Sequence, residues 1–205
     1  MIMIQRLFLL LTLIVTAASS AFADDADATL RETVSRLSAA KSIKANYTLT
    51  SSGESASGTL TFAGSKFVML SPSVKTWYDG KTQWTYLVDN EEVNITEPTA
   101  TELQQVNPFE ILSNYHANYT ARSLKASAGT KKIELKAKNA HSDISSATVT
   151  ISTANSMPRE ITVTMRNGRK ATITISSVVK GGELPVSTFR FPAGQYPGVE
   201  IIDLR

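Results

Sequence analysis

Two histidines are the residues of this chain best suited to metal binding or proton transfer. They are His116 and His141, in a sequence of 205 residues that contains no cysteine. A zinc site needs three or four histidine, cysteine or carboxylate ligands at binding spacing, and neither histidine belongs to such a cluster. His141 stands in the polar run 139–143. We therefore predict no metal site and expect both histidines at the surface or at an edge.

The serines give little support for nucleophilic catalysis. The sequence contains no Gly-x-Ser-x-Gly motif, no phosphate-binding loop and no dinucleotide fingerprint, and its serines fall in polar turns. A Ser-His-Asp triad is assembled in space rather than along the chain, so the sequence leaves that arrangement open. The residue pattern favours a protein that is not an enzyme and that uses no cofactor.

A stripe of aromatic and aliphatic residues is the feature with functional promise. Three short apolar runs between residues 67 and 88 are separated by a Ser-Pro and an Asp-Gly pair. Asp-Gly between such runs predicts a tight hairpin, because glycine accepts the positive φ of a type I′ turn. Trp77 and Trp84 fall on the two consecutive strands of this hairpin. Large aromatics on adjacent strands share an apolar space, which is either a filled core or a cavity for an apolar ligand.

The side chains that face this space follow from the alternation along the strands, because residues i and i+2 of a strand share a face. The spacing does not distinguish a lined cavity from a filled core. As the cavity hypothesis, we expect the following residues to point to the concave side of the sheet and to contact a bound apolar ligand: Tyr47, Leu60, Phe62, Phe67, Met69, Trp77, Trp84 and Tyr86.

The elements that position these residues follow from the hydrophobic periodicity. Leu30, Val34 and Leu37 recur at helical spacing and predict an amphipathic helix over residues 26–41. The pattern then changes to period two and predicts about ten or eleven strands, interrupted by short helical pieces within 99–115. A long antiparallel sheet with one apolar face curls, and helices cover the mouth of the curve. The predicted fold class is α+β, mostly antiparallel β.

The beginning of the chain and its charge indicate location and partners. Residues 1–23 combine Arg6, an apolar run over 7–18 and a small-x-small cleavage site, which predicts a secretory signal peptide. Residues 24–205 form one predicted domain, with 20 basic and 18 acidic residues after Arg6 is subtracted from the 21 basic ones. This balance argues against nucleic acid as a partner. An exported chain without cysteine fits a bacterial periplasm.

Several segments resemble one known family in their order and spacing. Residues 77–86 resemble the Asp-Gly-x-x-x-Trp-x-Tyr hairpin of the LolA-type periplasmic lipoprotein carriers. Residues 107–112 resemble the lid-helix segment of these carriers, and residues 189–192 with 199–204 resemble their C-terminal strand. The leading helix and residues 42–47 also match in kind and order. The resemblance covers nearly the whole of the predicted mature chain.

This resemblance implies an unclosed, strongly curved barrel of about 11 strands with a helical lid over a hydrophobic cavity. The lid corresponds to helices over 99–106 and 108–115, with Phe109, Ile111 and Leu112 as its apolar contacts. The family takes acylated lipoproteins from an inner-membrane release complex and delivers them to an outer-membrane receptor. The resemblance thus implies these partners, a periplasmic location and, as we expect for such a carrier, a monomer.

One turn departs from the family pattern. Family members commonly carry an Arg-Pro pair after the strand that contains Leu60 and Phe62, and that arginine holds the lid. Residues 63–66 have neither arginine nor proline at this place. The departure predicts a lid held mainly by apolar contacts, with Phe109 and Leu112 as anchors.

Three functions remain open from the sequence. The first is a periplasmic carrier that shields the acyl chains of lipoproteins and delivers them to the outer membrane. The second is a lipid-binding or lipid-sensing module on the same curved sheet, without a delivery role. The third is a solid β-domain that acts in adhesion or assembly. An empty concave face would favour the first two, and loss of the protein would strand lipoproteins at the inner membrane only in the first.

Overall fold

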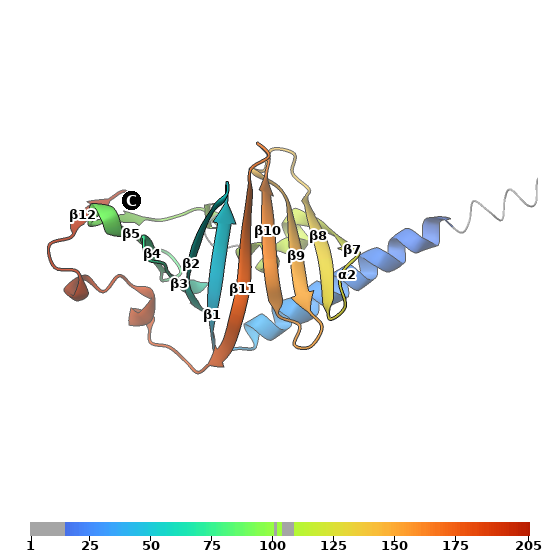
Figure 1. The fold of residues 1–205 in the computed structure, drawn as a ribbon, viewed down its shortest axis with the longest axis horizontal. Coiled ribbons are helices and arrows are strands. Elements are labelled where there is room, and N and C mark those ends of the chain that lie inside the picture. Colours follow the sequence, from blue (N-terminus) through green and yellow to red (C-terminus); the bar gives the residue numbers. More distant parts are fainter. Residues whose placement is uncertain (1–14, 101, 104–108) are drawn as a thin grey trace, which may run out of the picture.

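The computed structural model describes residues 15–100, 102–103 and 109–205, and Figure 1 shows their arrangement. These described residues contain twelve strands, which form a single sheet. Their bounds are β1 Ser42–Ser51, β2 Glu54–Ala63, β3 Lys66–Leu70, β4 Val74–Tyr78, β5 Gln83–Leu87, β6 Glu92–Thr96, β7 Tyr119–Leu124, β8 Thr130–Ala137, β9 Ile144–Ser152, β10 Pro158–Met165, β11 Lys170–Gly181 and β12 Glu200–Asp203.

The sheet is open and curled, with the strand order β12-β6-β5-β4-β3-β2-β1-β11-β10-β9-β8-β7. All neighbours are antiparallel except β12 and β6, which run parallel. The first and second halves of the chain are each built from successive hairpins. They join where β1 pairs with β11, from Ser42 opposite Gly181 to Ser51 opposite Ala171. The predicted fold class is confirmed, with twelve strands in place of about eleven.

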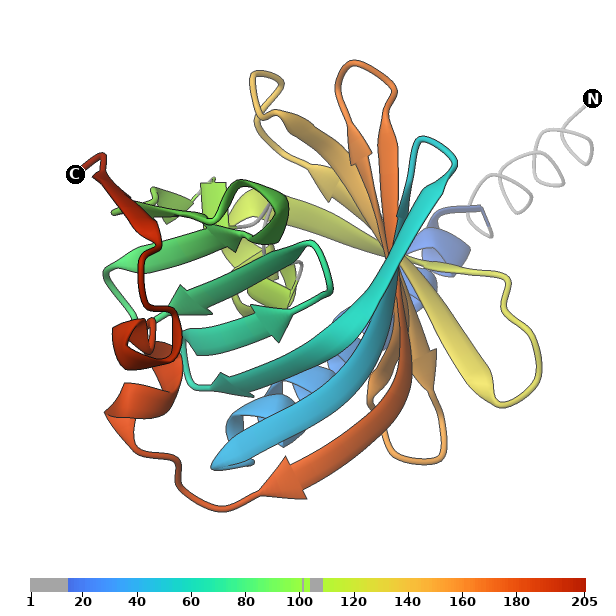
Figure 2. The ribbon, with the colours of Figure 1, turned by 60° about the vertical axis from the view of Figure 1, so that its left-hand side comes forward.

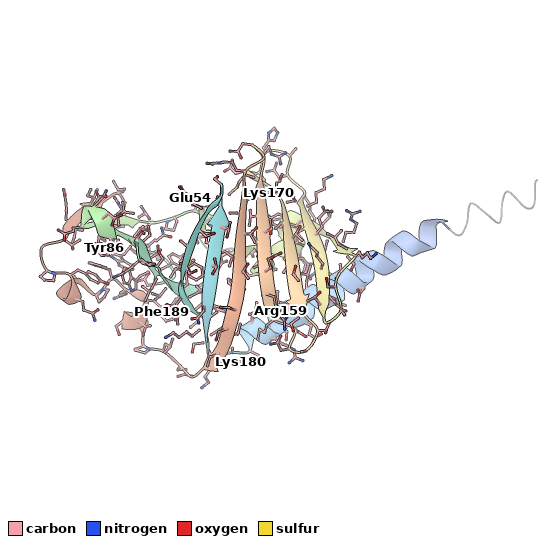
Figure 3. The ribbon with its side chains drawn as sticks, viewed as in Figure 1. Glu54, Tyr86, Arg159, Lys170, Lys180 and Phe189 are labelled. Carbon is pink, nitrogen blue, oxygen red and sulfur yellow. The ribbon has the colours of Figure 1, made fainter. Side chains whose placement is uncertain are left out.

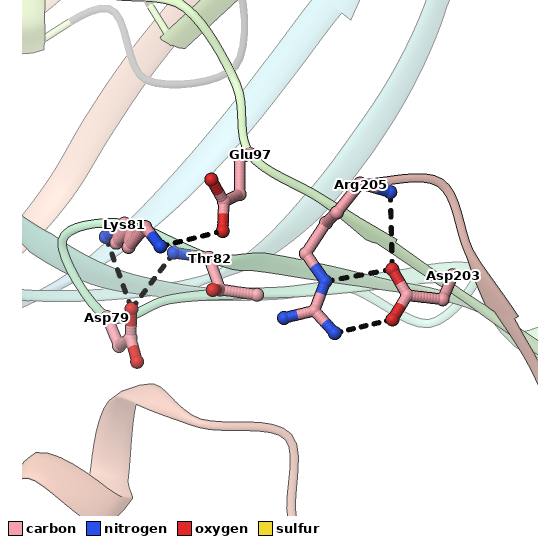
Figure 4. Close-up of polar contacts among 6 residues, drawn as sticks. All are labelled: Asp79, Lys81, Thr82, Glu97, Asp203 and Arg205. Carbon is pink, nitrogen blue, oxygen red and sulfur yellow. Dashed lines mark hydrogen bonds and ion pairs between the residues drawn. The ribbon is translucent and has the colours of Figure 1, made fainter.

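Glycine-containing turns set the register of the hairpins. The predicted Asn167-Gly168 turn joins β10 to β11, and Gly168 has a φ of 84°. The expected tight turn at Asp79-Gly80 is instead a loop of residues 79–82, in which the Asp79 carboxylate accepts hydrogen bonds from the backbone N–H groups of Lys81 and Thr82 (Figure 4). A side-chain acceptor of this kind stabilises a longer connection than a two-residue turn.

The helices lie on the concave side of the sheet (Figure 2). Helix α2, Val15–Ser38, begins earlier than the predicted helix, and its first part extends past the sheet (Figure 1). Helices α4, Phe109–Ser113, and α5, Tyr115–Asn118, follow each other in the predicted lid region. Residues 100 and 102–103 are also helical, whereas 101 and 104–108 of the predicted lid lie outside the described residues.

A large apolar core, here called the concave cluster, fills the space between these helices and the sheet. Its buried members come from α2, α4, α5 and nine of the strands. They are Ala26, Leu30, Ala45, Tyr47, Leu60, Phe67, Met69, Tyr78, Phe109, Ile111, Leu112, Tyr115, Tyr119, Ile133, Leu135, Ile144, Ala147, Val149, Ile151, Ile161, Val163, Ile173 and Ile175.

A second apolar core, here called the outer cluster, lies on the opposite face of β3–β6. Its buried members are Val68, Trp77, Tyr86, Val93 and Phe189, and the partly buried residues around them are Ala63, Trp84, Val88, Ile95, Phe191, Tyr196 and Val199. The C-terminal segment 182–205, here called the strap, covers this face. Figure 3 shows Phe189 of the strap and Tyr86 of β5 in the same half of the molecule.

The strap is mostly irregular. It contains two 3₁₀ helices, η2 at Val186–Phe189 and η3 at Ala193–Gln195, before β12 pairs with β6. Of the two segments expected to correspond to the C-terminal strand, 199–204 contains β12, whereas 189–192 is not a strand: Phe189 ends η2, and residues 190–192 lead to η3. The short 3₁₀ helix η1, Val88–Asn90, joins β5 to β6.

Candidate functional site

A cavity opens between the end of α2, the β2–β3 turn and α4. Its volume is about 370 Å³, and it is here called the lid pocket. The residues that line it are Val34, Leu37, Ser38, Phe62, Gly64, Ser65, Phe109, Glu110, Leu112, Ser113 and Asn114. This volume lies at the low end of the roughly 300–1,000 Å³ typical of small-molecule sites.

The deep wall of the lid pocket is apolar. Phe62 of β2 and Phe109 of α4 pack with ring centroids 5.3 Å apart. Leu37 of α2 lies beside both, and the same three residues border a small adjoining void of about 10 Å³ towards β1 and β11. Since Phe62 and Leu37 are only partly buried, apolar surface is exposed to the pocket, where it would favour burial of a ligand's hydrocarbon.

The rim of the lid pocket is polar and carries one carboxylate. The rim includes Ser65, Glu110 and Asn114. Glu110 accepts a hydrogen bond of 3.1 Å from the Ser113 hydroxyl. Burial raises the pKa of Tyr78 above its usual value, and the negative charges of Glu110 and Asp79 raise it further. Glu110 therefore places its charge at the border between the pocket and the concave face of β4.

The lid is tied to α2 by polar contacts as well as by packing. The Tyr115 hydroxyl donates a hydrogen bond of 2.8 Å to the Asp27 carboxylate of α2, and His116 Nδ1 lies 3.4 Å from the same carboxylate. Arg31 forms an ion pair with Asp27. Burial raises the pKa of Tyr115, and the hydrogen bond to Asp27 raises it further. The prediction of a mainly apolar lid thus describes α4, whereas α5 has a charged anchor.

The start of the preceding helical piece has a capping box. Thr99 Oγ1 accepts a hydrogen bond from the Glu102 backbone N–H at 3.3 Å, and the Glu102 carboxylate accepts one from the Thr99 backbone N–H at 2.7 Å. Such reciprocal bonds satisfy backbone donors at a helix N-terminus. They fix the place where the chain leaves β6 and enters the lid region.

The structure brings five of the eight predicted cavity residues to the concave side. Tyr47, Leu60, Phe67 and Met69 are buried in the concave cluster, and Phe62 packs against it at the pocket wall. Phe109, Ile111 and Leu112 of the predicted lid are buried in the same cluster, and two of them, Phe109 and Leu112, line the lid pocket. Whether any of these residues contacts a ligand remains a prediction.

The other three predicted cavity residues lie on the opposite face. Trp77, Trp84 and Tyr86 belong to the outer cluster, so the expectation that they point to the concave side is corrected. The register gives the reason: Val68 pairs with Trp77, which pairs with Trp84. Directly paired residues share a face, and Val68 alternates with the concave Phe67 and Met69. The run 67–70 is apolar on both faces, which hides its register in the sequence.

The concave face becomes polar where these aromatics were expected. Met69 pairs with Thr76, which pairs with Thr85. Tyr78 of the concave cluster pairs with Gln83, which in turn pairs with Thr96. These polar rows interrupt the apolar surface of the concave face, and beyond Thr76 and Thr85 the next pair on this face is Val74 with Leu87.

Sequence reasoning missed the contribution of α2 to the pocket. Val34 and Leu37 were recognised as the apolar side of a helix, and that side borders the lid pocket. A signal was present, because a helix that leads directly into the sheet must bury its apolar stripe against that sheet. The residues of the strap carried no periodicity that placed them over the outer face.

Both histidines lie at the surface, as predicted: His116 on α5 and His141 in the loop between β8 and β9 are exposed. Among the described residues, no group of three histidine, cysteine or acidic side chains is arranged to hold a metal ion. Within the same part of the chain, no helix is long and apolar enough to cross a bilayer.

The family of the chain follows from its match to a known family model. The model of the outer membrane lipoprotein carrier protein LolA matches residues 16–169. The chain belongs to the LolA family. The match spans α2 through β10, including the lid pocket, and it ends before β11 and the strap. A search of curated protein sequences found no match.

Solved structures with the same fold are distant in sequence. An uncharacterised conserved protein from Thermus thermophilus is 13% identical, with a TM-score of 0.58 over 87% of this chain and 99% of that chain. A domain from Vibrio parahaemolyticus named as a putative outer membrane lipoprotein-sorting protein is 11% identical, with a TM-score of 0.51 over 82% and 97%. At these identities the comparison supports the LolA-like fold alone.

Proposed function

We propose that this protein is a periplasmic carrier that shields lipoprotein acyl chains in the lid pocket and hands them on towards the outer membrane. The supporting observation is the open pocket with an apolar wall at Leu37, Phe62 and Phe109, beneath the lid of a LolA-family fold. The signal peptide over 1–23 belongs to this proposal, because a carrier of this kind must be exported.

The physical need for such a carrier is clear. Each methylene of an acyl chain costs about 0.8 kcal/mol to expose to water, so an acylated protein crosses an aqueous compartment only inside an apolar sheath. The sheath must also release its cargo. Nondirectional apolar contacts and a short lid meet both needs, and no catalytic group takes part.

A direct binding experiment tests the pocket. The purified protein is titrated with a fluorescently labelled, palmitoylated peptide, and Leu37→Trp is compared with the matched Leu204→Trp. Leu37 lines the pocket, whereas Leu204 is 61% exposed beyond β12. We expect Leu37→Trp to weaken binding at least tenfold and Leu204→Trp to leave it unchanged. Equal binding by the two variants would show that the pocket is not the site.

The delivery role is tested separately in cells. We expect depletion of the protein to leave lipoproteins in the inner membrane, measured by fractionation of the two membranes. Unchanged fractionation together with acyl binding in vitro would instead favour the lipid-binding or lipid-sensing module. The fluorescence of Trp77 and Trp84 is a poor measure of ligand binding in the lid pocket, because both residues lie on the outer face.

A further inference from the structure

We infer that the last part of β11, residues 176–181, binds an extended, acidic segment of the cargo polypeptide as an added β-strand. This inference rests on the proposed function and concerns the protein part of the acylated cargo. Residues 176–181 are here called the open edge. Three features support the inference: the unpaired backbone of the open edge, its position beside the lid pocket, and the charge around it.

The open edge exists because β11 is longer than its pairing with β10. β11 pairs with β1 from Ala171 to Gly181, but it pairs with β10 only from Lys170 to Thr174. Residues 176–181 therefore have a neighbouring strand on one side. Within the described part of the chain, no backbone group outside β1 forms a hydrogen bond with them.

The sequence explains why the two strands part. Glu160 lies opposite Thr174, so the next pair would bring Pro158 opposite Ser176, and proline has no N–H to donate to a ladder. The register with β1 also shifts at Ser176, since its neighbours Ile175 and Ser177 take consecutive partners on β1. Such a bulge increases the local twist. The end of β11 accordingly turns away from β10 (Figure 2).

The open edge is accessible to another chain. All six of its residues are exposed, and Val178 and Val179 are 36% and 60% exposed. An exposed strand edge presents a row of N–H and C=O groups that can pair with an extended peptide. In such complexes the backbone bonds supply affinity, and alternate side chains contact the receiving protein.

The open edge begins beside the ligand cavity. Val178 lines the small void that adjoins the lid pocket, together with Ile175. Leu37, Phe62 and Phe109 line both the void and the pocket. The polypeptide attached to an acyl chain in the pocket would therefore leave the cavity near the open edge.

The charge around the open edge favours an acidic segment. Lys180 lies on the edge and Arg159 at the start of β10, towards the same end of the sheet (Figure 3). Neither forms an ion pair with any described residue. Glu183 is already paired with Lys41. Acidic side chains on the added strand would give these cations partners.

The same charges disfavour a second copy of this chain as the occupant. Two open edges that paired with each other in a symmetric dimer would bring both copies of Lys180 and Arg159 to one interface. Like charges on neighbouring strands are destabilising. A polar, acidic peptide meets no such repulsion.

The test uses an N-palmitoylated peptide of about eight residues, rich in serine, threonine and aspartate. The reference probe is N-palmitoyl glycinamide, which carries the same acyl chain with almost no peptide. Two further peptides carry methyl groups on alternate backbone nitrogens, one at the odd positions and one at the even positions. Successive N–H groups of a strand point to opposite edges, so only one of these two sets can face β11.

We expect the unmodified peptide to bind about tenfold more tightly than the reference probe, since each hydrogen bond of the added strand contributes a factor of a few. One methylated peptide should lose this gain and the other should keep it. Calorimetry below the micelle-forming concentrations measures the affinities. Amide hydrogen exchange in residues 176–181 should slow with the unmodified peptide but not with the reference probe.

Lys180→Glu tests the charge, and Lys170→Glu at the other end of β11 is the matched control (Figure 3). Lys170 lies opposite Thr164 in the part of β11 that β10 covers. Lys180→Glu should weaken binding of the acidic peptide about two- to fivefold, as expected for a solvent-exposed ion pair. It should leave the reference probe unaffected, and Lys170→Glu should change neither affinity.

Four results would overturn the inference. Equal binding of the unmodified peptide and the reference probe, or equal effects of the two methylation sets, would refute strand addition. Equal responses to Lys180→Glu and Lys170→Glu would refute the acidic preference. A dimer whose open edge is protected without any peptide would assign the edge to a second copy. In all four cases the proposed carrier function stands if the reference probe binds and Leu37→Trp weakens it; if that probe does not bind, the proposed function fails together with the inference.

Discussion

The two apolar clusters of this molecule are closed in different ways. The concave cluster is covered by helices α2, α4 and α5, and the cover leaves a cavity of about 370 Å³ at its edge. The outer cluster is covered by the strap, whose Phe189 is 1% exposed. None of the residues that line this cavity belongs to the outer cluster. The comparison suggests that one face is built to open to a ligand and the other to stay closed.

The contacts on the two faces support this difference. On the outer face, Phe191 lies 5.4 Å from Trp77 between ring centroids, and Tyr196 lies 4.8 Å from Tyr86. Lys75 Nζ also lies 3.2 Å from the Tyr196 hydroxyl, and the β12–β6 pairing holds the end of the strap. On the concave face, the five-residue helix α4 relies mainly on three buried apolar side chains. The polar contacts of the lid are made by α5, through the Tyr115 hydrogen bond to Asp27.

The largest single-residue effect is expected at Phe189. Phe189→Ala should lower the free energy of unfolding by about 3–5 kcal/mol, since it removes a fully buried aromatic side chain. Chemical denaturation measures this change, with the exposed Leu204→Ala as the control. Binding of the palmitoylated peptide should be preserved under native conditions. Weakened binding with a well-folded variant would contradict the independence of the two faces.

Phe109→Ala should affect ligand binding more and stability less than Phe189→Ala does. Its stability cost is expected at about 3 kcal/mol or less, because Phe109 borders a cavity and is 9% exposed. Peptide binding should weaken, and amide hydrogen exchange should increase in α4 and α5 but not in the strap. Exchange in α4 that remains as slow as in the central strands would mean that this segment is not a lid.

Tyr115→Phe tests the polar anchor of the lid. Removing the hydrogen bond to the Asp27 carboxylate should cost about 1.5 kcal/mol, the lower end of the range for bonds to charged groups. A double-mutant cycle with Asp27→Ala separates this bond from the other contacts of Asp27. A coupling free energy near zero would show that this hydrogen bond does not help to hold the lid.

The smallest effect is expected at the ion pair between the strap and the β4–β5 loop. Arg190 Nε donates to the Asp79 carboxylate at 3.1 Å, and Arg190 is 60% exposed, so Arg190→Gln should cost only about 0.2–1 kcal/mol.

Burial raises the pKa of Asp79, but the backbone hydrogen bonds from Thr82 and Lys81 and the bond from Arg190 bring it below 3.8. A lowered pKa means that the stabilisation is present above pH 3.8 and is lost as pH falls through the folded-state value. When the free energy of unfolding is measured at decreasing pH, it should fall by less for Arg190→Gln than for the unmodified protein. An equal fall for both proteins would show that the backbone hydrogen bonds, and not Arg190, lower the pKa of Asp79.

The sequence predicted the concave half of the molecule better than the outer half. Strands such as β8 alternate one apolar face with one wet face, so Ile133 and Leu135 could be placed from spacing alone. In β3 the consecutive residues Phe67, Val68 and Met69 are all buried, because both faces are covered. Period-two reasoning cannot assign a face to such a run.

The outer cover was beyond sequence reasoning for a second reason. The strap is built from 3₁₀ turns and irregular backbone, which leave no hydrophobic period. Its position depends on long-range contacts, such as those of Phe189 with the outer cluster. A cavity on the concave side was predicted, but the residues facing it were only partly correct. The polar residues on the concave face of β4 and β5 follow from the register of their hairpin. That register could not be derived from the sequence, because the loop was expected to be shorter.

The pairing of β1 with β11 has a consequence for the time course of folding. Residues 42–51 meet residues 171–181 there, whereas most other neighbouring strands are joined by short connections. Two local meanders can form early, but the seam between them closes a loop of more than a hundred residues, which is slow. Until it closes, β1 and β11 each present an open edge with apolar side chains, and such edges pair readily with other chains. The period of greatest risk of aggregation for this protein should therefore be set by one strand pair at the centre of its sheet.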